Sequence, residues 1–337
     1  MARYVKAKFV SNAVILQYHR VSESDIDPFG LCTKPWHFEE HLQALKDHAC
    51  PIGIDELSRA CHEGHIPDRA VVVTFDDGYL DNLINAKPLL VRFHIPATVF
   101  IATGYIGQSR GFWWDELAEL LLQSGTLPNK LCLQLQDDAC QWDLGPAVSY
   151  SEADRRGDYD CRVWTMKPGS RFAFYYSVWQ RLRPLSGALR KVALDQIRSW
   201  SSSKPTHNST HRPLSAEELQ SLAQGGMTDV GAHTVSHAML PACSIENQRH
   251  EILESKISLE RLLARPVTSF AYPYGEYTGE TATLVREAGF ACACSTVPES
   301  FQRDILRNSR YLTLPRIAAE DCNGKQFVNY LDRWFKS

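Results

Sequence analysis

Short apolar runs rich in β-branched residues alternate along the chain with segments of helical periodicity. The apolar runs lie at 13–18, 70–75, 97–101, 228–232, 267–272, 290–295 and 311–316. Between them, Ser215 and Glu218 form a capping box for a helix that ends at Gly225–Gly226, and a longer helical segment covers about 245–264. Because strands that alternate with helices build parallel sheets, the sequence predicts a parallel α/β fold, either an open sheet or a barrel.

The alternation is interrupted between about 111 and 213. A stretch rich in tryptophan and tyrosine is followed there by one rich in serine, proline and histidine. The chain has 337 residues and 44% apolar content, which suits one barrel with additions. We therefore predict a single domain over 1–337, with an insertion at about 111–213.

Composition excludes several classes of protein. The formal net charge is −3, with 36 basic and 39 acidic residues and no basic stripe, so we expect no nucleic-acid partner. No apolar run is long enough to predict an integral membrane segment. The N-terminus has no signal-peptide core, so we expect a cytoplasmic protein whose ten cysteines are reduced thiols. Partner proteins are unknown.

Reactive side chains follow four of the predicted strands. They are His19, the pair Asp76 and Asp77, the pair His233 and His237, and the turn Tyr272-Pro273-Tyr274. Because the carboxyl ends of parallel strands converge on one face, we expect these residues to meet there.

Their residue types are those of a catalytic metal site. If the segment after 228–232 turns helical, the spacing of His233 and His237 places both imidazoles on one face. One aspartate can then bind the cation, which offsets the repulsion between adjacent carboxylates, while the other accepts a proton from a water on the metal. Each motif alone has a simpler interpretation, namely a helix cap, a chance histidine spacing or a turn. Their joint occurrence after strands favours a metal site.

The sequences TFDDGY, HTVSH and YPYG resemble the motifs of the polysaccharide deacetylase family, the NodB-homology group of carbohydrate esterases. The resemblance covers about 13–101 and 212–337. It implies an irregular (β/α)7 barrel and metal-dependent hydrolysis of acetyl groups, N-acetyl above all, on an oligo- or polysaccharide of bacterial surface metabolism. Two alternatives stay open: an amide or imide hydrolase acting on a non-sugar substrate, and a catalytically silent barrel that binds glycans.

The resemblance also implies a role for individual residues. Asp76 matches the general base, and Asp77, His233 and His237 match the ligands of a divalent metal ion, with zinc expected. Tyr274 matches the residue whose backbone N–H stabilises the oxyanion. Further substrate contacts are expected from aromatic and proline residues, although buried core is an alternative for both tryptophans. These residues are Tyr79, Trp113, Trp114, Tyr272 and Pro273.

Two positions depart from the family pattern. Ala271 stands where an arginine usually orients the base, and Arg316 stands where a histidine usually acts as general acid. Because arginine does not release its proton at neutral pH, we predict that Arg316 pairs with Asp76 instead; a surface charge is the alternative. His19, after Tyr18, matches the acid histidine of family members with a permuted motif order, such as poly-N-acetylglucosamine deacetylases. Its alternative is a structural histidine at a strand end.

Behind this site, Asp81 and Asn82 are expected to begin the next helix and to form hydrogen bonds that support the site.

Overall fold

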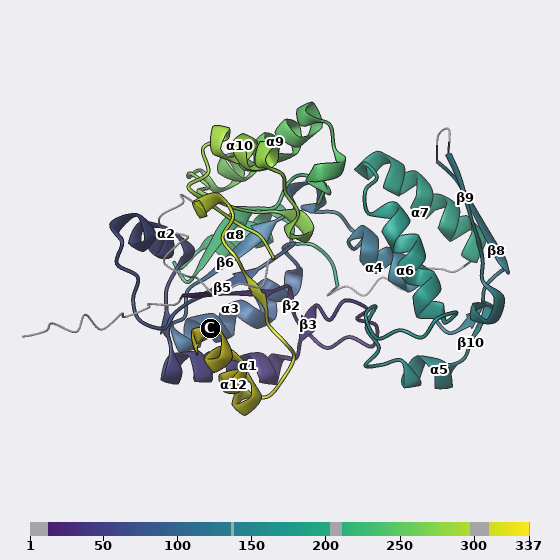
Figure 1. Ribbon diagram of the computed structural model, residues 1–337, viewed down its shortest axis with the longest axis horizontal. Coiled ribbons are helices and arrows are strands. Elements are labelled where there is room, and N and C mark those ends of the chain that lie inside the picture. The colour runs from purple at the N-terminus through teal and green to yellow at the C-terminus, as the bar shows by residue number, and fades with distance from the viewer. Residues whose placement is uncertain (1–12, 136–137, 203–210, 297–309, 337) are drawn as a thin grey trace, which may run out of the picture.

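The computed structural model describes residues 13–135, 138–202, 211–296 and 310–336 (Figure 1). Its centre is an eight-stranded sheet with the strand order β13-β12-β11-β6-β5-β1-β14, in which β4 also pairs with β5. These strands are β1 (Val14–Tyr18), β4 (Cys50–Pro51), β5 (Ala70–Phe75), β6 (Ala97–Ile101), β11 (Thr228–Ala232), β12 (Ser269–Ala271), β13 (Cys292–Cys294) and β14 (Ile317–Ala318). All neighbouring pairs run parallel, which confirms the predicted α/β class.

A short C-terminal segment, residues 314–318, joins the two edges of the sheet. Leu314 forms a parallel bridge to Cys294 of β13, and β14 then pairs with β1 on the other edge. The sheet is therefore curled into an irregular barrel, as the resemblance implies. The prediction of a strand over 311–316 is wrong, because Pro315 lacks the N–H that a continuous ladder requires.

Helices cover the outside of the curled sheet, with α1 and α12 on one side and α9 and α10 on another (Figure 1). The helices of this barrel are α1 (Pro35–His48), α2 (Ile54–Glu63), α3 (Lys87–Phe93), α8 (Ala216–Ala223), α9 (Ile245–Leu263), α10 (Gly279–Glu287) and α12 (Gly324–Lys336). Because both faces of the sheet are covered, its central strands are buried; every residue of β1, β5 and β6 is buried. The predicted capping box of Ser215 and Glu218 is present at the start of α8.

The described elements from Trp113 to Ser201, between β6 and α8, form a separate lobe, drawn mostly in teal in Figure 1. Its elements are α4 (Trp113–Leu121), β7 (Gly125–Thr126), β8 (Lys130–Leu135), β9 (Asp138–Asp143), β10 (Ser149–Tyr150), α5 (Glu152–Gly157), α6 (Arg171–Leu182) and α7 (Gly187–Ser201). Apolar side chains of α4, α6, α7 and β8 pack together in a cluster of their own. Tyr79 and Tyr274 belong to this cluster too, so the lobe packs directly against the carboxyl ends of β5 and β12.

Short elements complete the chain. They are β2 (Arg20–Val21), β3 (Cys32–Thr33), the π-helix η1 (Asn82–Ala86) and the 3₁₀ turns η2 (Thr103–Tyr105), η3 (Gly145–Val148), η4 (Leu240–Ala242), η5 (Pro273–Gly275) and η6 (Arg310–Leu312). In the described ranges we find no helix whose length and apolar content would let it span a bilayer.

Candidate metal centre and active site

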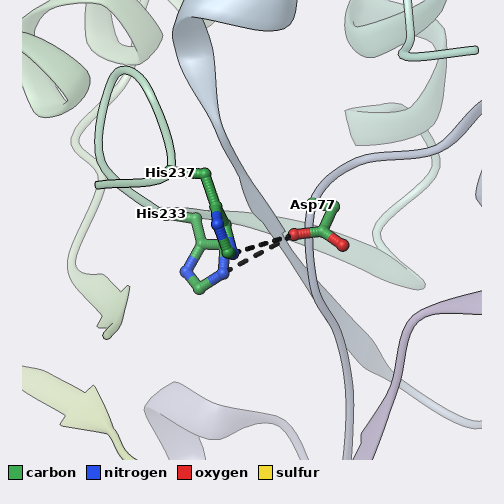
Figure 2. A group of neighbouring side chains, drawn as sticks. All are labelled: Asp77, His233 and His237. Atoms are coloured by element: carbon green, nitrogen blue, oxygen red, sulfur yellow. Dashed lines mark ion pairs between the residues drawn. The ribbon is translucent and has the colours of Figure 1, made fainter. Parts of the chain in front are cut away.

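Asp77, His233 and His237 converge at the carboxyl ends of β5 and β11 (Figure 2). The Asp77 Oδ1 atom lies 3.7 Å from His233 Nε2 and 3.4 Å from His237 Nε2. All three side chains are buried. One carboxylate oxygen and two imidazole nitrogens at this spacing form a donor set that can hold a divalent cation.

A tight turn directs the two adjacent aspartates toward different partners. The chain reverses directly after β5, where Asp77 (φ 75°) and Gly78 (φ 88°) both adopt the left-handed conformation. Aspartate tolerates this conformation better than most residues, and glycine adopts it freely. As a result, the Asp77 carboxylate faces the histidines while the Asp76 carboxylate faces Arg316.

The histidines reach the same point without a helical turn, so that expectation is wrong. Thr234 (φ 63°) and His237 (φ 52°) are left-handed, which bends residues 233–237 into an irregular loop. Glu251 of α9 holds this loop, because its carboxylate accepts hydrogen bonds from the backbone N–H groups of Val235 (2.9 Å) and Ser236 (2.8 Å). The loop places the two imidazole centroids 4.9 Å apart.

The hydrogen bonding and electrostatics of the three side chains suit a bound cation, because a cation would supply the counter-charge that the buried Asp77 carboxylate lacks. The His233 Nδ1 atom lies 2.7 Å from the Ala271 carbonyl oxygen; since a carbonyl only accepts, Nδ1 carries the proton and Nε2 presents its lone pair to Asp77. Asp77 Oδ1 is buried without a hydrogen-bond partner. Burial and the nearby Asp76 raise the pKa of Asp77, and burial and His233 lower the pKa of His237. A buried acceptor without a donor and two neutral imidazoles therefore fit a metal ion.

Arg316 and Asp76 form the predicted pair. The guanidinium donates from Nη1 to Oδ1 and from Nη2 to Oδ2, both at 2.7 Å, and Gln17 Nε2 donates to Oδ2 at 2.7 Å. Burial raises the pKa of Asp76, but Arg316 opposes this through its charge and its hydrogen bonds, and the pKa of Asp76 lies well below its usual value. The segment that closes the sheet thus keeps Asp76 ionised. The polar Gln17 interrupts the apolar run of β1, and this interruption is the signal in the sequence that points to a role at the site.

His19 follows β1 and lies within electrostatic reach of Asp76 and His233. Burial lowers the pKa of His19 to about 4, Asp76 partly offsets this effect, and Arg316 adds to it. Its imidazole is therefore neutral at pH 7 and must take up a proton before it can donate one. Its catalytic role stays a prediction.

Asp81 and Asn82 support the site from behind, as expected. Asp81 Oδ2 pairs with Arg20 Nε at 3.0 Å and Oδ1 accepts from the Val21 N–H at 3.0 Å. Asn82 Nδ2 donates to the carbonyl oxygen of His19 at 2.9 Å, which fixes the backbone at that residue.

The aromatic and proline residues expected to contact a substrate are all buried. Trp114 and Tyr274 flank His237, each with its ring centroid 4.6 Å from the imidazole. Tyr79 and Tyr272 are completely buried, so neither side chain can reach a substrate from solvent. Their hydroxyl groups donate to Asp115 and to the carbonyl of Leu312. Pro273 is likewise buried, and Trp113 and Trp114 are 4% and 6% exposed, which fits the core alternative for both tryptophans.

Arg190 of α7 is a site residue that the sequence did not reveal. Its side chain is 1% exposed and donates from Nη2 to the Ser236 carbonyl (2.7 Å) and from Nη1 to the His237 carbonyl (3.4 Å). It therefore holds the histidine loop from the side opposite the barrel. A contact between residues so far apart in the chain leaves no local pattern.

Comparison with known proteins agrees with this site. The family model described as polysaccharide deacetylase matches residues 63–127 and 197–293, which include the two aspartates and both histidines. YxkH of Bacillus subtilis is 28% identical over 303 residues, which are 89% of this chain and 70% of YxkH. The poly-beta-1,6-N-acetyl-D-glucosamine N-deacetylase of Staphylococcus epidermidis is 32% identical over 120 residues, but the match spans only 31% of this chain and 41% of that protein.

Solved structures show the same fold. The deacetylase PplD of Streptococcus pyogenes, in complex with acetate, superposes with a TM-score of 0.58 at 17% identity and covers 95% of this chain and 98% of its own. IcaB of Ammonifex degensii gives a TM-score of 0.57 at 16% identity, with 97% and 98% covered. From the matched family model, the relatives and the shared fold, we conclude that the chain carries a polysaccharide deacetylase domain.

Proposed function

We propose that this protein is a metal-dependent hydrolase that removes N-acetyl groups from glucosamine residues of a bacterial surface polysaccharide. The observation that carries the proposal is the pairing of two buried groups at one barrel end. Asp77, His233 and His237 form a donor set for a cation, and beside it Asp76 is kept ionised by Arg316. The substrate class is taken from the staphylococcal relative, which is named for poly-beta-1,6-N-acetyl-D-glucosamine.

Zinc is the cation that we propose for this site. Two imidazole nitrogens and one carboxylate oxygen are a common donor set of catalytic zinc, in which water or substrate takes the fourth position. When bound, such a cation polarises a carbonyl oxygen and acidifies a coordinated water.

Asp76 acts as the general base. Its two oxygens accept three hydrogen bonds from Arg316 and Gln17, and a carboxylate has about four lone-pair sites, so one stays available for a proton. Because its pKa is held low, Asp76 is a weak base toward ordinary water and needs a water that is already acidified. This requirement links Asp76 to the adjacent donor set.

Two further residues complete the proposed reaction. The left-handed turn at Tyr274 (φ 60°) positions the backbone N–H that we assign to the developing oxyanion. His19 is the group that we assign to protonation of the departing amine, because it lies near Asp76 at the same barrel end. Arg316 is a positioning residue for Asp76.

The proposal is tested by acetate release from N-acetylglucosamine oligomers. We compare metal-stripped protein, zinc-reloaded protein and zinc-reloaded Asp76→Asn, with Asp68→Asn as a matched control because Asp68 is exposed. We expect release only with zinc, a loss of at least about a hundredfold in Asp76→Asn, and full activity in Asp68→Asn.

Other outcomes separate the alternatives. Hydrolysis of a cyclic imide but of no acetylated sugar would identify the non-sugar amidase. Saturable oligomer binding without acetate release, in protein that holds zinc, would identify a silent glycan-binding barrel.

A further inference from the structure

A cavity of about 350 Å³ lies beside the metal centre. The loop that joins β2 and β3 (residues 22–31) forms one wall, and α4 with Tyr175 of α6 forms the other. Trp114 lines this cavity, and the ring of Trp114 also contacts His237, so the cavity and the metal centre are separated by one indole. Its volume is at the lower end of the range for small-molecule sites, which suits a single sugar ring.

The cavity is lined by more carboxyl groups than its arginine side chains can neutralise. Asp115 and Glu119 lie one turn apart on α4 and both line the cavity. Within the described part of the chain, neither carboxyl forms an ion pair. The two arginines of the lining are paired with other acids, Arg20 with Asp81 and Arg155 with Asp25.

The environment of these two carboxyl groups favours a cationic partner. Burial raises the pKa of Asp115 to about 6 and the pKa of Glu119 to about 7, and Asp115 adds to the rise at Glu119. The neighbouring Asp27 already accepts hydrogen bonds from the backbone N–H groups of Leu31 and Cys32. Glu23, the remaining acid of the lining, is exposed, and Asp115 accepts one hydrogen bond, from the Tyr79 hydroxyl. Asp115 and Glu119 are thus the half-buried carboxyl groups left to bind a ligand.

A buried donor and aromatic rings complete the lining. Arg20 is 4% exposed, and its Nη2 atom has no hydrogen-bond partner, while Nε is bonded to Asp81 and the guanidinium lies over the Tyr79 ring. This side chain is therefore fixed with one donor unsatisfied. Phe29 and Trp114 add apolar surface. Charged acceptors, a fixed donor and aromatic faces are what a cationic sugar requires.

We propose that this cavity binds a hexosamine residue whose amine is free and protonated. The ammonium group lies between Asp115 and Glu119, a ring hydroxyl accepts from Arg20 Nη2, and the apolar ring face packs on Trp114 or Phe29. The inference rests on the proposed function, because removal of an N-acetyl group leaves such an amine. It adds a specificity: the enzyme acts preferentially on an acetylated residue next to one that is already deacetylated.

Binding tests the cavity without relying on catalysis. We measure calorimetrically the affinity of the zinc-loaded protein for D-glucosamine and for N-acetyl-D-glucosamine at pH 7.5. We expect glucosamine to bind at least about tenfold more tightly and Glu119→Gln to reduce its affinity about tenfold. Glu246→Gln, which removes an exposed carboxyl elsewhere, serves as the matched control and binds like the wild type. Equal affinity for the two sugars, or wild-type binding by both Glu119→Gln and Asp115→Asn, overturns the proposal.

A second arm distinguishes the cavity from the catalytic centre. Asp76→Asn should bind glucosamine like the wild type, whereas loss of binding in this variant would place the ligand at the metal centre and overturn the proposal. If glucosamine binds through Glu119 but no oligomer releases acetate, the proposed function is wrong while the binding site in the cavity stands. If acetate release instead depends on Asp76 and proceeds with equal kcat/KM on fully and partly acetylated trisaccharides, the cavity proposal is wrong while the proposed function stands.

Discussion

Replacement of Arg316 by methionine should destabilise the protein through Asp76. In the native structure the guanidinium donates to both carboxylate oxygens, to Thr74 Oγ1 (3.2 Å) and to the Ser295 carbonyl (3.0 Å). Methionine fills similar space but donates nothing, so Asp76 would keep only the hydrogen bond from Gln17. The variant would therefore bury an anion without its counter-charge.

The size of the effect follows from this burial. Both partners are almost inaccessible to solvent, with side-chain exposures of 0% and 2%. Removal of one partner of a buried ion pair costs about 3–5 kcal/mol, far more than the pair itself contributes relative to an apolar pair. Asp76→Asn combined with Arg316→Met leaves no buried charge and should lose less stability than the two single variants together, by roughly 2–3 kcal/mol.

Urea unfolding at pH 7 measures these losses, with a chelator present so that metal binding does not contribute. Arg249→Met is the matched control, because Arg249 pairs with Glu287 on the surface and its loss should cost less than about 1 kcal/mol. The reasoning is refuted if Arg316→Met costs as little as Arg249→Met, or if the losses at Asp76 and Arg316 are simply additive.

Three further changes test other parts of the site and fold. His19→Ala should lower kcat for acetate release about 10²–10⁴-fold while the zinc content is unchanged. Glu251→Gln should weaken zinc affinity about tenfold in competition dialysis, because its carboxylate holds the histidine loop. His41 is buried and its folded pKa is lowered to about 4 from 6.5, mainly by burial. Its contribution to stability is therefore complete above pH 6.5 and is lost as the pH falls toward 4. Wild type should lose about 2 kcal/mol more than His41→Gln between pH 7 and pH 5 in urea unfolding.

Each of these predictions has a contrary result. Near wild-type turnover in His19→Ala would remove this residue from the reaction. Unchanged zinc affinity in Glu251→Gln would show that the loop keeps its shape unaided. Parallel pH profiles for His41→Gln and the wild type would show that this histidine does not control the acid response.

The strand core could be predicted because its signal is local. The runs at 70–75, 97–101 and 228–232 coincide with strands of the structure, since a strand buried on both faces needs a continuous apolar sequence. The acidic pair and the histidines could be assigned to one site for a similar reason, because the carboxyl ends of parallel strands meet.

The other features of the site could not be predicted from the sequence, because they depend on backbone conformation and on contacts between residues far apart in the chain. The loop that carries the histidines is not helical because Thr234 and His237 have left-handed backbone conformations. Neither position is a glycine, so the sequence does not predict these conformations. The role of Arg190 follows from the packing of α7 against that loop, and the role of Gln17 from the curl of the sheet. The pairing of Arg316 with Asp76 could be predicted only from the resemblance to the family. Arg316 stands where the family usually has a histidine, and an arginine at that position suggests a partner for the base.

The closure of the sheet by residues 314–318 has a consequence for how the site is assembled. Both aspartates and both histidines precede Arg316 in the sequence, so the segment that closes the barrel is separate from the elements that carry the metal ligands. Until that segment inserts between β1 and β13, Asp76 lacks its counter-charge, and the donor set for the metal faces an incomplete barrel wall. Ionisation of Asp76 is therefore coupled to closure of the barrel, so that a chain in which residues 314–318 are detached can hold the metal ligands and still lack a working base.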